Sequence, residues 1–596
     1  MQDFDVWAPS AQDSVELVLG QETVAMTRSG QWWRTDRPAT AGQRYAFRID
    51  GNGPFPDPRS RYQPDGPNGA SQIVDPRSFT WTDDAWVGVP LQGAVIYELH
   101  IGTFTEGGTL DAAIERLDYL ADLGVNVVEL MPVAAFPGER GWGYDGVDLY
   151  AVHEAYGGPS ALARFVDAAH ARGLGVCLDV VYNHLGPSGN YLSEFGPYFT
   201  DRHHTPWGSA VNLDAPGSNE VRRFIVDNAL MWFRDLHIDA LRLDAVHALV
   251  DERAVHVLEQ LEIETEALAA QLGRSLLLIA ESDRNDPATV TRRAPGGSGG
   301  LGLTGQWADD VHHTLHVLLT GETAGYYGDF ADNGAFAKVA RTPFFHDGTW
   351  STFRGRDHGR AVVPLLTPGW KYVASLQTHD QVGNRATGER LSQLIGRDRL
   401  AAGATLLLTL PYTPMLFMGE EWGASTKWAY FTDHQEPELA TAVSKGRRAE
   451  FAEHGWGDDV PDPQASSTAD SSTLRWEELS QEPHVRLLGW YRTLIRLRRT
   501  TPELADPSLG VTQVHRDGDV LVYRRGACTV VVNLSNEPVT HRIEDRVADG
   551  SGVDGSVADA SVEVLAGWEA VHEGHEIRVA PDGSVIYRVT AEKARK

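Results

Sequence analysis

The chain has 596 residues, more than one ordinary hydrophobic core can hold, so several domains are expected. Its composition is that of a globular protein, and its formal net charge of -30 repels nucleic acid and anionic lipid surfaces, so neither is expected as a partner. No run of about 20 apolar residues offers a membrane span, and the first residues lack a secretion signal, which predicts a cytoplasmic protein. Cys177 and Cys528 lie in apolar, strand-like runs and are expected to be packed thiols.

Residues 1–90 are predicted to form an N-terminal β-sandwich. The short alternating runs VELVL, QWWRTD and RYAFRIDGNG indicate strands separated by turns. The proline-rich passage PFPDPRSRYQPDGP then predicts an extended connector to the next domain.

Residues 91–505 are predicted to form a (β/α)8 barrel with loop insertions. Apolar strand-like runs alternate with helical patterns that stop at glycine, such as LDAAIERLDYLADLG and SALARFVDAAHARG. Near-continuous apolar strands joined by helices are typical of a parallel sheet covered by helices, and eight such strands favour a closed barrel. The expected strands are AVIYELH, VNVVELMPV, VCLDVVYNH, DALRLDAV, SLLLIAES, GQWAD, YVASLQTHD and MLFMGEEWG.

Residues 506–596 are predicted to form a C-terminal β-sandwich. The alternating runs DVLVYRRG and CTVVVNLSN indicate strands again after the last barrel helix. The predicted fold class is therefore α/β, a barrel with a β-domain on each side.

Polar residues follow several predicted barrel strands, at the point where each strand ends. A single one of them is well explained as a capping or solvated loop residue. Four successive strand ends are harder to explain in this way, because the carboxyl ends of barrel strands meet at one pocket. The residues expected to share this pocket are Asp179, His184, Arg242, Asp244, Glu281, His379 and Asp380.

Asp244 and Glu281 end strands that are neighbours in the chain, and their spacing predicts glycosidase chemistry. Neighbouring strands lie about 4.8 Å apart, so two inward carboxyl groups can sit about 5 to 5.5 Å from each other, which suits a retaining glycosidase. One carboxylate then attacks the anomeric carbon while the other, kept protonated, donates to the leaving oxygen. Arg242 shares a strand face with Asp244 and is expected to orient it, Asp380 offers a third carboxylate, and both histidines can bind sugar hydroxyls.

The set DVVYNH, ALRLDAVH, AES and THDQ resembles, in order and spacing, the four signature regions of the α-amylase family of glycoside hydrolases. The resemblance implies Asp244 as nucleophile, Glu281 as general acid/base and Asp380 as stabiliser of the transition state. It also implies that Arg242, His184 and His379 line the subsite of the sugar whose bond is cut.

Further stretches, among them ERGWGYDGVDLYAVHEAYGGP, HTPWGSAVNLDAPGS, IAESDRNDP and QWADDVHHTLH, are similar to those of family members that release trehalose. This likeness implies hydrolysis of the α-1,4 bond next to the terminal trehalose of maltooligosyl trehalose. Tyr144 is then expected to stack on the sugar and Asp145 to bind its hydroxyls. Trp207 is either a platform under the released trehalose or a core residue. The alternatives are a branching or debranching enzyme, or a noncatalytic glycan-binding protein.

No metal or other cofactor is expected. His312 and His316 have a spacing that can hold a divalent ion on a helix, but the catalytic glutamate of a zinc-protease helix is missing, and packing explains them better. Glu420 and Glu421, after the last barrel strand, either border the leaving side of the pocket or begin a helix.

Overall fold

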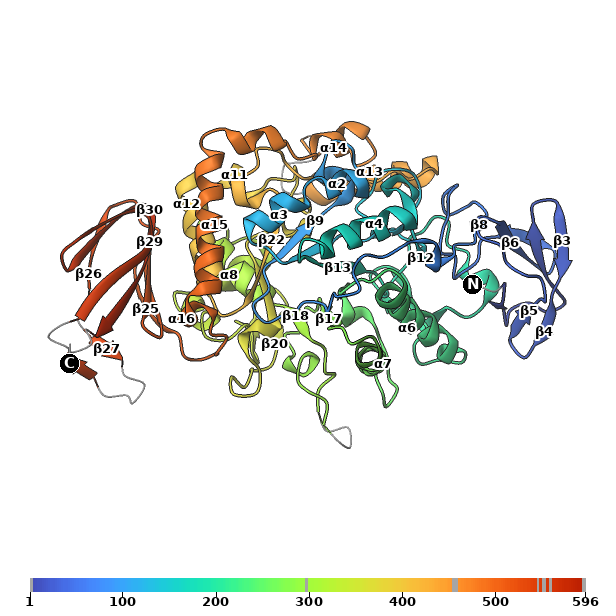
Figure 1. Cartoon of the computed structure of the whole chain (residues 1–596), viewed down its shortest axis with the longest axis horizontal. Coiled ribbons are helices and arrows are strands. Elements are labelled where there is room, and N and C mark those ends of the chain that lie inside the picture. Colours follow the sequence, from blue (N-terminus) through green and yellow to red (C-terminus); the bar gives the residue numbers. More distant parts are fainter. Residues whose placement is uncertain are drawn as a thin grey trace.

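The computed structural model describes residues 4–294, 299–452, 459–543, 546–548, 554–556 and 560–591. At its centre lies a closed barrel of parallel strands, with the N-terminal β-domain at one end of the molecule and the C-terminal β-domain at the other (Figure 1). This arrangement confirms the predicted fold class of a (β/α)8 barrel flanked by two β-domains.

All eight barrel strands overlap runs predicted from the sequence, although β22 begins two residues before its predicted run. Around the ring they are β9 (Ile96–Leu99), β10 (Val127–Leu130), β13 (Gly175–Val180), β16 (Ala240–Leu243), β17 (Leu277–Ala280), β18 (Gly305–Trp307), β21 (Tyr372–Ser375) and β22 (Thr413–Phe417). The last strand pairs with the first and closes the barrel. Every residue of these strands is buried, because one face lines the interior and the other lies under helices.

The interior of the barrel changes from apolar to charged along its axis. Its lower part is filled by Ile96, Val127, Cys177, Ala240, Leu277, Ile279, Trp307, Val373 and Met415. Because side chains alternate along a strand, residues two positions further on share the inward face. Those residues include Glu98, Glu129, Asp179, Arg242 and Glu281. The charged layer therefore sits directly below the carboxyl ends of the strands.

Helices cover the outside of the barrel. The longer ones are α3 (Leu117–Leu123), α4 (Gly158–His170), α6 (Ser218–Asp235), α7 (Val257–Leu272), α8 (Asp309–Thr320), α12 (Arg397–Thr409), α13 (Pro437–Ala452) and α15 (His484–Thr500). The run LDAAIERLDYLADLG, expected as one helix, is divided into α2 (Leu110–Ile114) and α3. As predicted, α3 stops at Gly124, whose φ of 100° is left-handed and suits glycine.

Short elements in the loops build up the rim of the barrel. The helices among them are α1 (Ile101–Phe104), α5 (Leu192–Phe195), α9 (Ala335–Val339), α10 (His379–Gly383), α11 (Leu391–Leu394), α14 (Ser466–Ser471) and α16 (Pro502–Ala505). The strands form three antiparallel pairs: β11 (Ala134–Ala135) with β12 (Asp148–Val152), β14 (Phe199–Thr205) with β15 (Gly208–Val211), and β19 (Thr349–Ser351) with β20 (Arg356–His358).

The N-terminal domain consists of two antiparallel sheets. One contains β1 (Val6–Trp7), β5 (Trp32–Arg34) and β4 (Thr27–Ser29). The other contains β3 (Glu22–Ala25), β2 (Val15–Leu19), β6 (Arg44–Ile49), β7 (Asn52–Phe55) and β8 (Ser71–Gln72). Buried side chains such as Trp33 and Phe47 belong to the same hydrophobic cluster as the layer between the barrel strands and their helices, so the domain packs firmly against the outside of the barrel.

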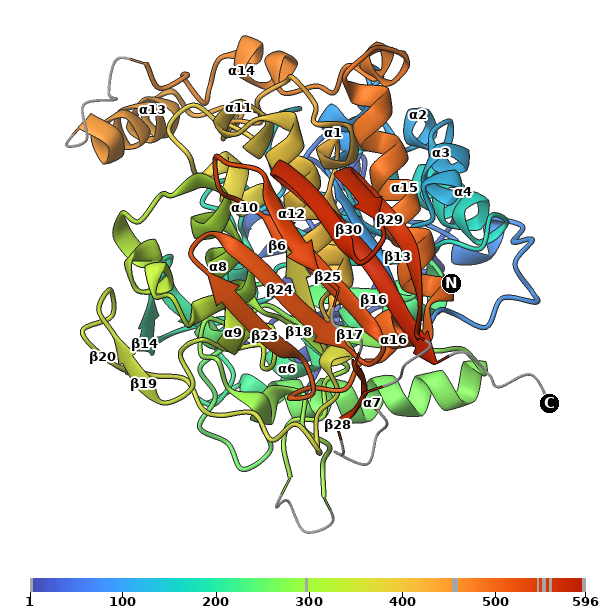
Figure 2. The same ribbon diagram turned by 90° about the vertical axis from the view of Figure 1, so that its left-hand side faces the viewer.

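The C-terminal domain is built on one six-stranded antiparallel sheet. It contains β23 (Gln513–Asp517), β24 (Val520–Arg525), β25 (Cys528–Asn533), β30 (Glu576–Ala591), β26 (Val539–Arg542) and β29 (Ala560–Glu573). A ribbon of β27 (Arg546–Ala548) and β28 (Asp554–Ser556) accompanies it. The sheet lies across α12 and α15, and so is attached to the end of the barrel (Figure 2).

Cys177 and Cys528 are both buried free thiols, as predicted. Among the helices of the described residues, none combines the length and the apolar character that crossing a membrane requires.

Candidate active site

The carboxyl ends of the barrel strands open into a cleft of about 990 Å³. Residues from several strand ends and from several loops line it together. Those among the residues singled out from the sequence are Tyr144, Asp145, His184, Trp207, Asp244, Glu281, His379 and Asp380.

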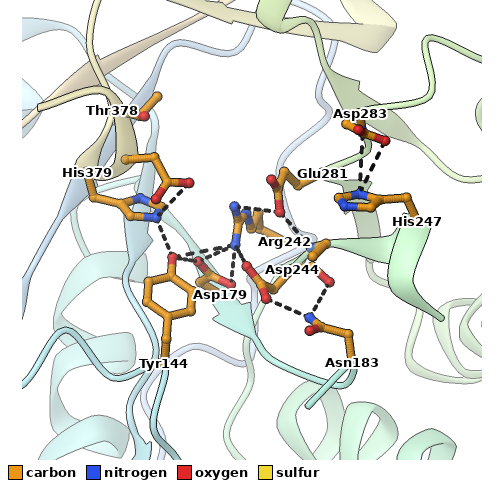
Figure 3. A network of polar contacts seen from close by, with 12 residues as sticks. Tyr144, Asp179, Asn183, Arg242, Asp244, His247, Glu281, Asp283, Thr378 and His379 are labelled. Carbon is orange, nitrogen blue, oxygen red and sulfur yellow. Dashed lines mark hydrogen bonds and ion pairs between the residues drawn. The ribbon is translucent and has the colours of Figure 1, made fainter. Parts of the chain in front are cut away.

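Arg242 lies beneath the cleft and joins the carboxylates around it (Figure 3). Its side chain is fully buried, and its Nη1 donates to Asp179 and to Asp244, each at 2.8 Å. Its Nη2 lies 3.1 Å from Oε2 of Glu281. The guanidinium also covers the ring of Trp307 at 4.4 Å from the centroid. The arginine in buried strand β16 is thus a counter-charge shared by three acidic groups.

Asp244 is held from two sides. Arg242 binds its Oδ1, and the amide of Asn183 donates to its Oδ2 at 2.6 Å and to its backbone carbonyl at 2.9 Å. These donors suit a carboxylate, which only accepts hydrogen bonds. Asp244 therefore keeps one orientation, with its edge exposed to the cleft.

Ala245, next in the chain, has a φ of 38°, in the left-handed region that non-glycine residues rarely adopt. This conformation turns its backbone N–H toward Glu281, whose Oε2 accepts it at 2.6 Å. Backbone strain of this kind persists where the surrounding structure fixes it, and here it links Asp244 to Glu281.

Glu281 is suited to hold a proton at neutral pH. Burial raises its pKa, the negative charges of Asp244 and Asp380 raise it further, and Arg242 opposes them, which together bring the pKa to about 8. A carboxyl group with this pKa can donate a proton to a leaving oxygen near neutral pH.

Asp380 is the most open of the three carboxylates, with a side chain that is 40% exposed. It lies in the first turn of α10, whose start is capped by the Thr378 hydroxyl accepting from the N–H of Gln381 at 3.3 Å. Its Oδ2 is 3.6 Å from Nε2 of His379, which is buried. The cap fixes the turn that presents both side chains to the cleft.

Tyr144 forms one wall of the cleft. Its hydroxyl donates to Asp179 at 2.6 Å, and its ring stacks on that of His379 with 5.1 Å between centroids. The preceding Gly143 has a φ of 98°, and a Cβ there would lie 2.2 Å from the carbonyl oxygen of Pro132. Only glycine fits this turn, which brings the tyrosine against the strand ends.

His184 and Trp207 form a stacked pair that also lines the cleft. His184 Nε2 is 3.0 Å from the carbonyl oxygen of Tyr144, and its ring lies parallel to that of Trp207, 4.6 Å away. Trp207, in the turn of the β14–β15 hairpin, is 49% exposed, so it is not a core residue. Asp145 approaches His434 at 3.9 Å beside this pair.

Comparison with known proteins identifies the family. Residues 72–206 match the α-amylase catalytic domain. The chain is 53% identical to the malto-oligosyltrehalose trehalohydrolase of Rhizobium sp. (strain M-11) over 90% of its length and 91% of that protein, and 53% identical to the one from Arthrobacter ramosus over 96% and 97%. The chain belongs to the malto-oligosyltrehalose trehalohydrolase family. A crystal structure of a Salmonella typhimurium protein assigned to the alpha-amylases has a TM-score of 0.87 and 37% identity, and covers 98% of this chain and 97% of its own.

Membership of the trehalohydrolase family makes the protein a glycoside hydrolase, as the sequence predicted. All nine residues proposed as site residues lie in one place, because eight line the cleft and Arg242 lies directly beneath them. Their individual roles remain predictions.

Three residues of the trehalohydrolase site were missed from the sequence: Asn183, Trp307 and Glu98. Asn183 lies within the motif DVVYNH, beside a histidine that was singled out. Glu98 carried the same signal as Arg242, a charged residue facing inward in a buried strand. Its partner is His379, whose Nδ1 is 2.5 Å from its Oε1.

Glu420 and Glu421 do not border the trehalohydrolase cleft. Both are buried outside it, at a short 3-10 helix after β22. Glu421 accepts from Tyr97 and Tyr119, and Glu420 accepts from Tyr491. The alternative expectation, that they begin a helical turn, is the one that the structure supports.

Candidate metal ligands lie away from the catalytic carboxylates. His312 is buried against His316, which pairs with Glu322 at 2.8 Å, so both histidines are used in packing. Within the described ranges, the ligand atoms of His203, Asp214 and Glu252 lie within 4.8 Å of one another. Arg202 forms ion pairs with both of these carboxylates and already supplies a positive charge there.

Proposed function

We propose that the protein hydrolyses the α-1,4-glucosidic bond next to the terminal trehalose of maltooligosyl trehalose, with retention of configuration, and releases trehalose and a maltooligosaccharide. The names of the related proteins support the substrate. The observation that carries the mechanism is the bridging of Asp244 and Glu281, from neighbouring strands, by one buried arginine.

In the first step, a carboxylate oxygen of Asp244 attacks the anomeric carbon on the face opposite the leaving group. The bond between this carbon and the trehalose oxygen breaks, and Glu281 transfers its proton to that oxygen. Trehalose leaves, and the maltooligosyl unit remains attached to Asp244 as an ester.

In the second step, water attacks the same carbon from the face that trehalose has left. Glu281, now a carboxylate, takes the proton of the water, and the bond to Asp244 breaks. The two inversions give an α-configured maltooligosaccharide and restore both carboxyl groups. Asp380 stabilises the positive charge that develops on the sugar in each step.

The remaining residues bind the sugar whose bond is cut. Tyr144 stacks on it, while Asp145, His184 and His379 bind its hydroxyl groups. Arg242 holds Asp244 in its attacking orientation from below. The compartment proposed for this reaction is the cytoplasm, and the two buried free thiols are compatible with a reducing environment.

The test is a comparison of products from purified protein incubated with maltotriosyl trehalose, maltopentaose and amylose. Trehalose release much faster than cleavage of maltopentaose, with an α-configured new reducing end, is the expected result. New α-1,6 branches without net hydrolysis would indicate a branching enzyme instead. Binding of the oligosaccharides without any cleavage would indicate a glycan-binding protein.

Trp207 is proposed as the platform under the released trehalose, because its ring is half exposed at the cleft and braced by His184. Trp207→Ala is expected to raise the KM for maltotriosyl trehalose about 5- to 30-fold, since an aromatic contact contributes about 1 to 2 kcal/mol. The Ki for trehalose as product inhibitor should rise by a similar factor.

Trp350→Ala is the matched control, because Trp350 is 60% exposed but does not line the cleft. It should leave both constants unchanged, and Trp207→Phe should retain most of the affinity. An unaltered Ki for trehalose in Trp207→Ala would rule out the platform.

A further inference from the structure

Glu98 is a buried glutamate in the first barrel strand, and both of its oxygens are used by one residue. Its Oε1 lies 2.5 Å from Nδ1 of His379, and its Oε2 accepts the backbone N–H of the same histidine at 2.9 Å. Both side chains are 1% exposed. The contact exists because barrel closure places β9 near the end of β21, from which α10 begins. Glu98 does not line the cleft, so it acts on the site only through His379.

The other side of the His379 ring faces Tyr144, and the hydrogen-bond directions there are determined. The tyrosine hydroxyl has one proton and donates it to Asp179 at 2.6 Å. Burial raises the pKa of Asp179, to about 6, so this aspartate is an acceptor at neutral pH. The tyrosine oxygen, 2.7 Å from Nε2 of His379, must then accept from it. Nε2 therefore carries a proton, and Nδ1 carries another because it faces the carboxylate of Glu98.

We propose that Glu98 is a positioning residue that holds His379 as an imidazolium, so that a charged donor faces Tyr144, Asp380 and the sugar in the cleft. The inference rests on the proposed function, to which it adds one residue below the site. The resulting chain of contacts runs from Glu98 through His379, the neutral hydroxyl of Tyr144 and Asp179 to Arg242.

The groups that face His379 from each packed element decide its charge. They are Glu98 from β9, His100 directly after β9, Asp380 from α10, Arg242 from β16, Asp179 from β13 and Tyr144 from the loop before β12. Burial alone would lower the pKa of His379, but the carboxylates of Asp380 and Glu98 outweigh it and raise the pKa to about 9. If Glu98 is removed, Asp380 is the one of these two carboxylates that remains. It then has to offset both burial and the charge of Arg242, each of which lowers the pKa of His379.

The chain offers a matched control in Glu129, which is paired in register with Glu98 on the neighbouring strand β10. It is equally buried, and its carboxyl group faces the thiol of Cys177 rather than the cleft. Burial, followed by the charge of Glu98, raises its pKa to about 8, so the group is already neutral at pH 7. Glu129→Gln replaces a neutral carboxyl by a neutral amide of the same shape and should leave turnover unchanged.

The experiment compares the pH dependence of kcat/KM, which reports the pKa values of the free protein, for maltotriosyl trehalose in wild type, Glu98→Gln, Glu98→Asp and Glu129→Gln. In wild type and in Glu129→Gln the alkaline limb should lie at about 8, the pKa of Glu281. In Glu98→Gln the amide donates to Nδ1 of His379 and favours a neutral ring, so the alkaline limb should move below about 7. At pH 8 the value of kcat/KM should be about 10- to 100-fold lower than in wild type, and it should recover toward pH 6. Glu98→Asp keeps the charge and should restore the limb to near 8.

A second readout does not depend on the substrate. In protein labelled with 15N-histidine, the ring signals of His379, assigned by their absence in His379→Gln, should be those of an imidazolium at pH 7.5 in wild type. In Glu98→Gln they should be those of a neutral ring. If the glutamine variant does not fold, the wild-type signals still test the inference, because a neutral His379 ring at pH 7.5 would overturn it.

The outcomes separate this inference from the proposed function. A Glu98→Gln variant with lower activity at every pH, an unmoved limb and a charged His379 would show that Glu98 only supports packing, while trehalose release by wild type would leave the proposed function intact. If wild type releases no trehalose, the proposed function fails. The 15N signals still decide whether Glu98 sets the charge of His379.

Discussion

Replacement of Asp244 by alanine is expected to lower kcat for maltotriosyl trehalose by at least about 10⁴-fold, because the variant lacks the carboxylate that forms the covalent intermediate. Substrate binding should survive, since Tyr144, His184 and Trp207 still line the cleft. The measurement is trehalose release under saturating substrate, with affinity followed separately by calorimetry. Unchanged turnover in the variant would exclude Asp244 as the nucleophile.

Azide gives the same variant a positive test. Asp244→Ala leaves space beside Arg242 and Asn183, and an azide ion placed there can attack the anomeric carbon from the face that Asp244 used. The expected product is a β-configured maltooligosyl azide, because only one inversion takes place. A product of α configuration would mean that another group had already formed an intermediate on that face.

The barrel could be predicted from the sequence because its strands are buried on both faces and therefore read as continuous apolar runs. Most were found in this way, whereas β18 (Gly305–Trp307) is short and contains the polar Gln306. The division between α2 and α3 could not be found, because the apolar spacing of Leu110, Ile114, Leu117 and Leu120 continues through it. Local backbone geometry, rather than the pattern of side chains, breaks the helix.

Much of the site could be predicted for a related physical reason. A charged residue in a buried strand needs a partner, and the alternation along β16 places Arg242 and Asp244 on the same inward face. Glu98 is also a charged residue in a buried strand, but its partner could not be predicted from the sequence. His379 is 281 residues away and contacts Glu98 only after the barrel closes.

The environment of Trp207 could not be predicted from the sequence. Whether its ring packs in the core or faces the cleft depends on where the β14–β15 hairpin folds back, which no residue pattern in the hairpin specifies. In the structure the ring lies on His184 and is half exposed. A pairing between two loops of the rim therefore decides its environment.

Replacement of Glu281 by glutamine should lower kcat for maltotriosyl trehalose about 10³- to 10⁴-fold and remove the alkaline limb of the pH profile. In wild type the group is a proton donor below its pKa of about 8, so the rate falls as pH rises through that value. Glutamine has no titrating proton, so the residual rate should not change in this range. Glu420→Gln is the matched control, because burial raises the pKa of Glu420 to about 8 as well, but its side chain lies outside the cleft.

The nature of the leaving group distinguishes a proton donor from a residue that only supports the cleft. Maltotriosyl fluoride of α configuration loses fluoride without needing a proton, so Glu281→Gln should form the intermediate on Asp244 at nearly the wild-type rate. Azide, which needs no general base, should then release it as an α-configured azide, opposite to the product from Asp244→Ala. Equal losses on fluoride and on maltotriosyl trehalose would contradict the acid role, because a distorted cleft would slow both substrates alike.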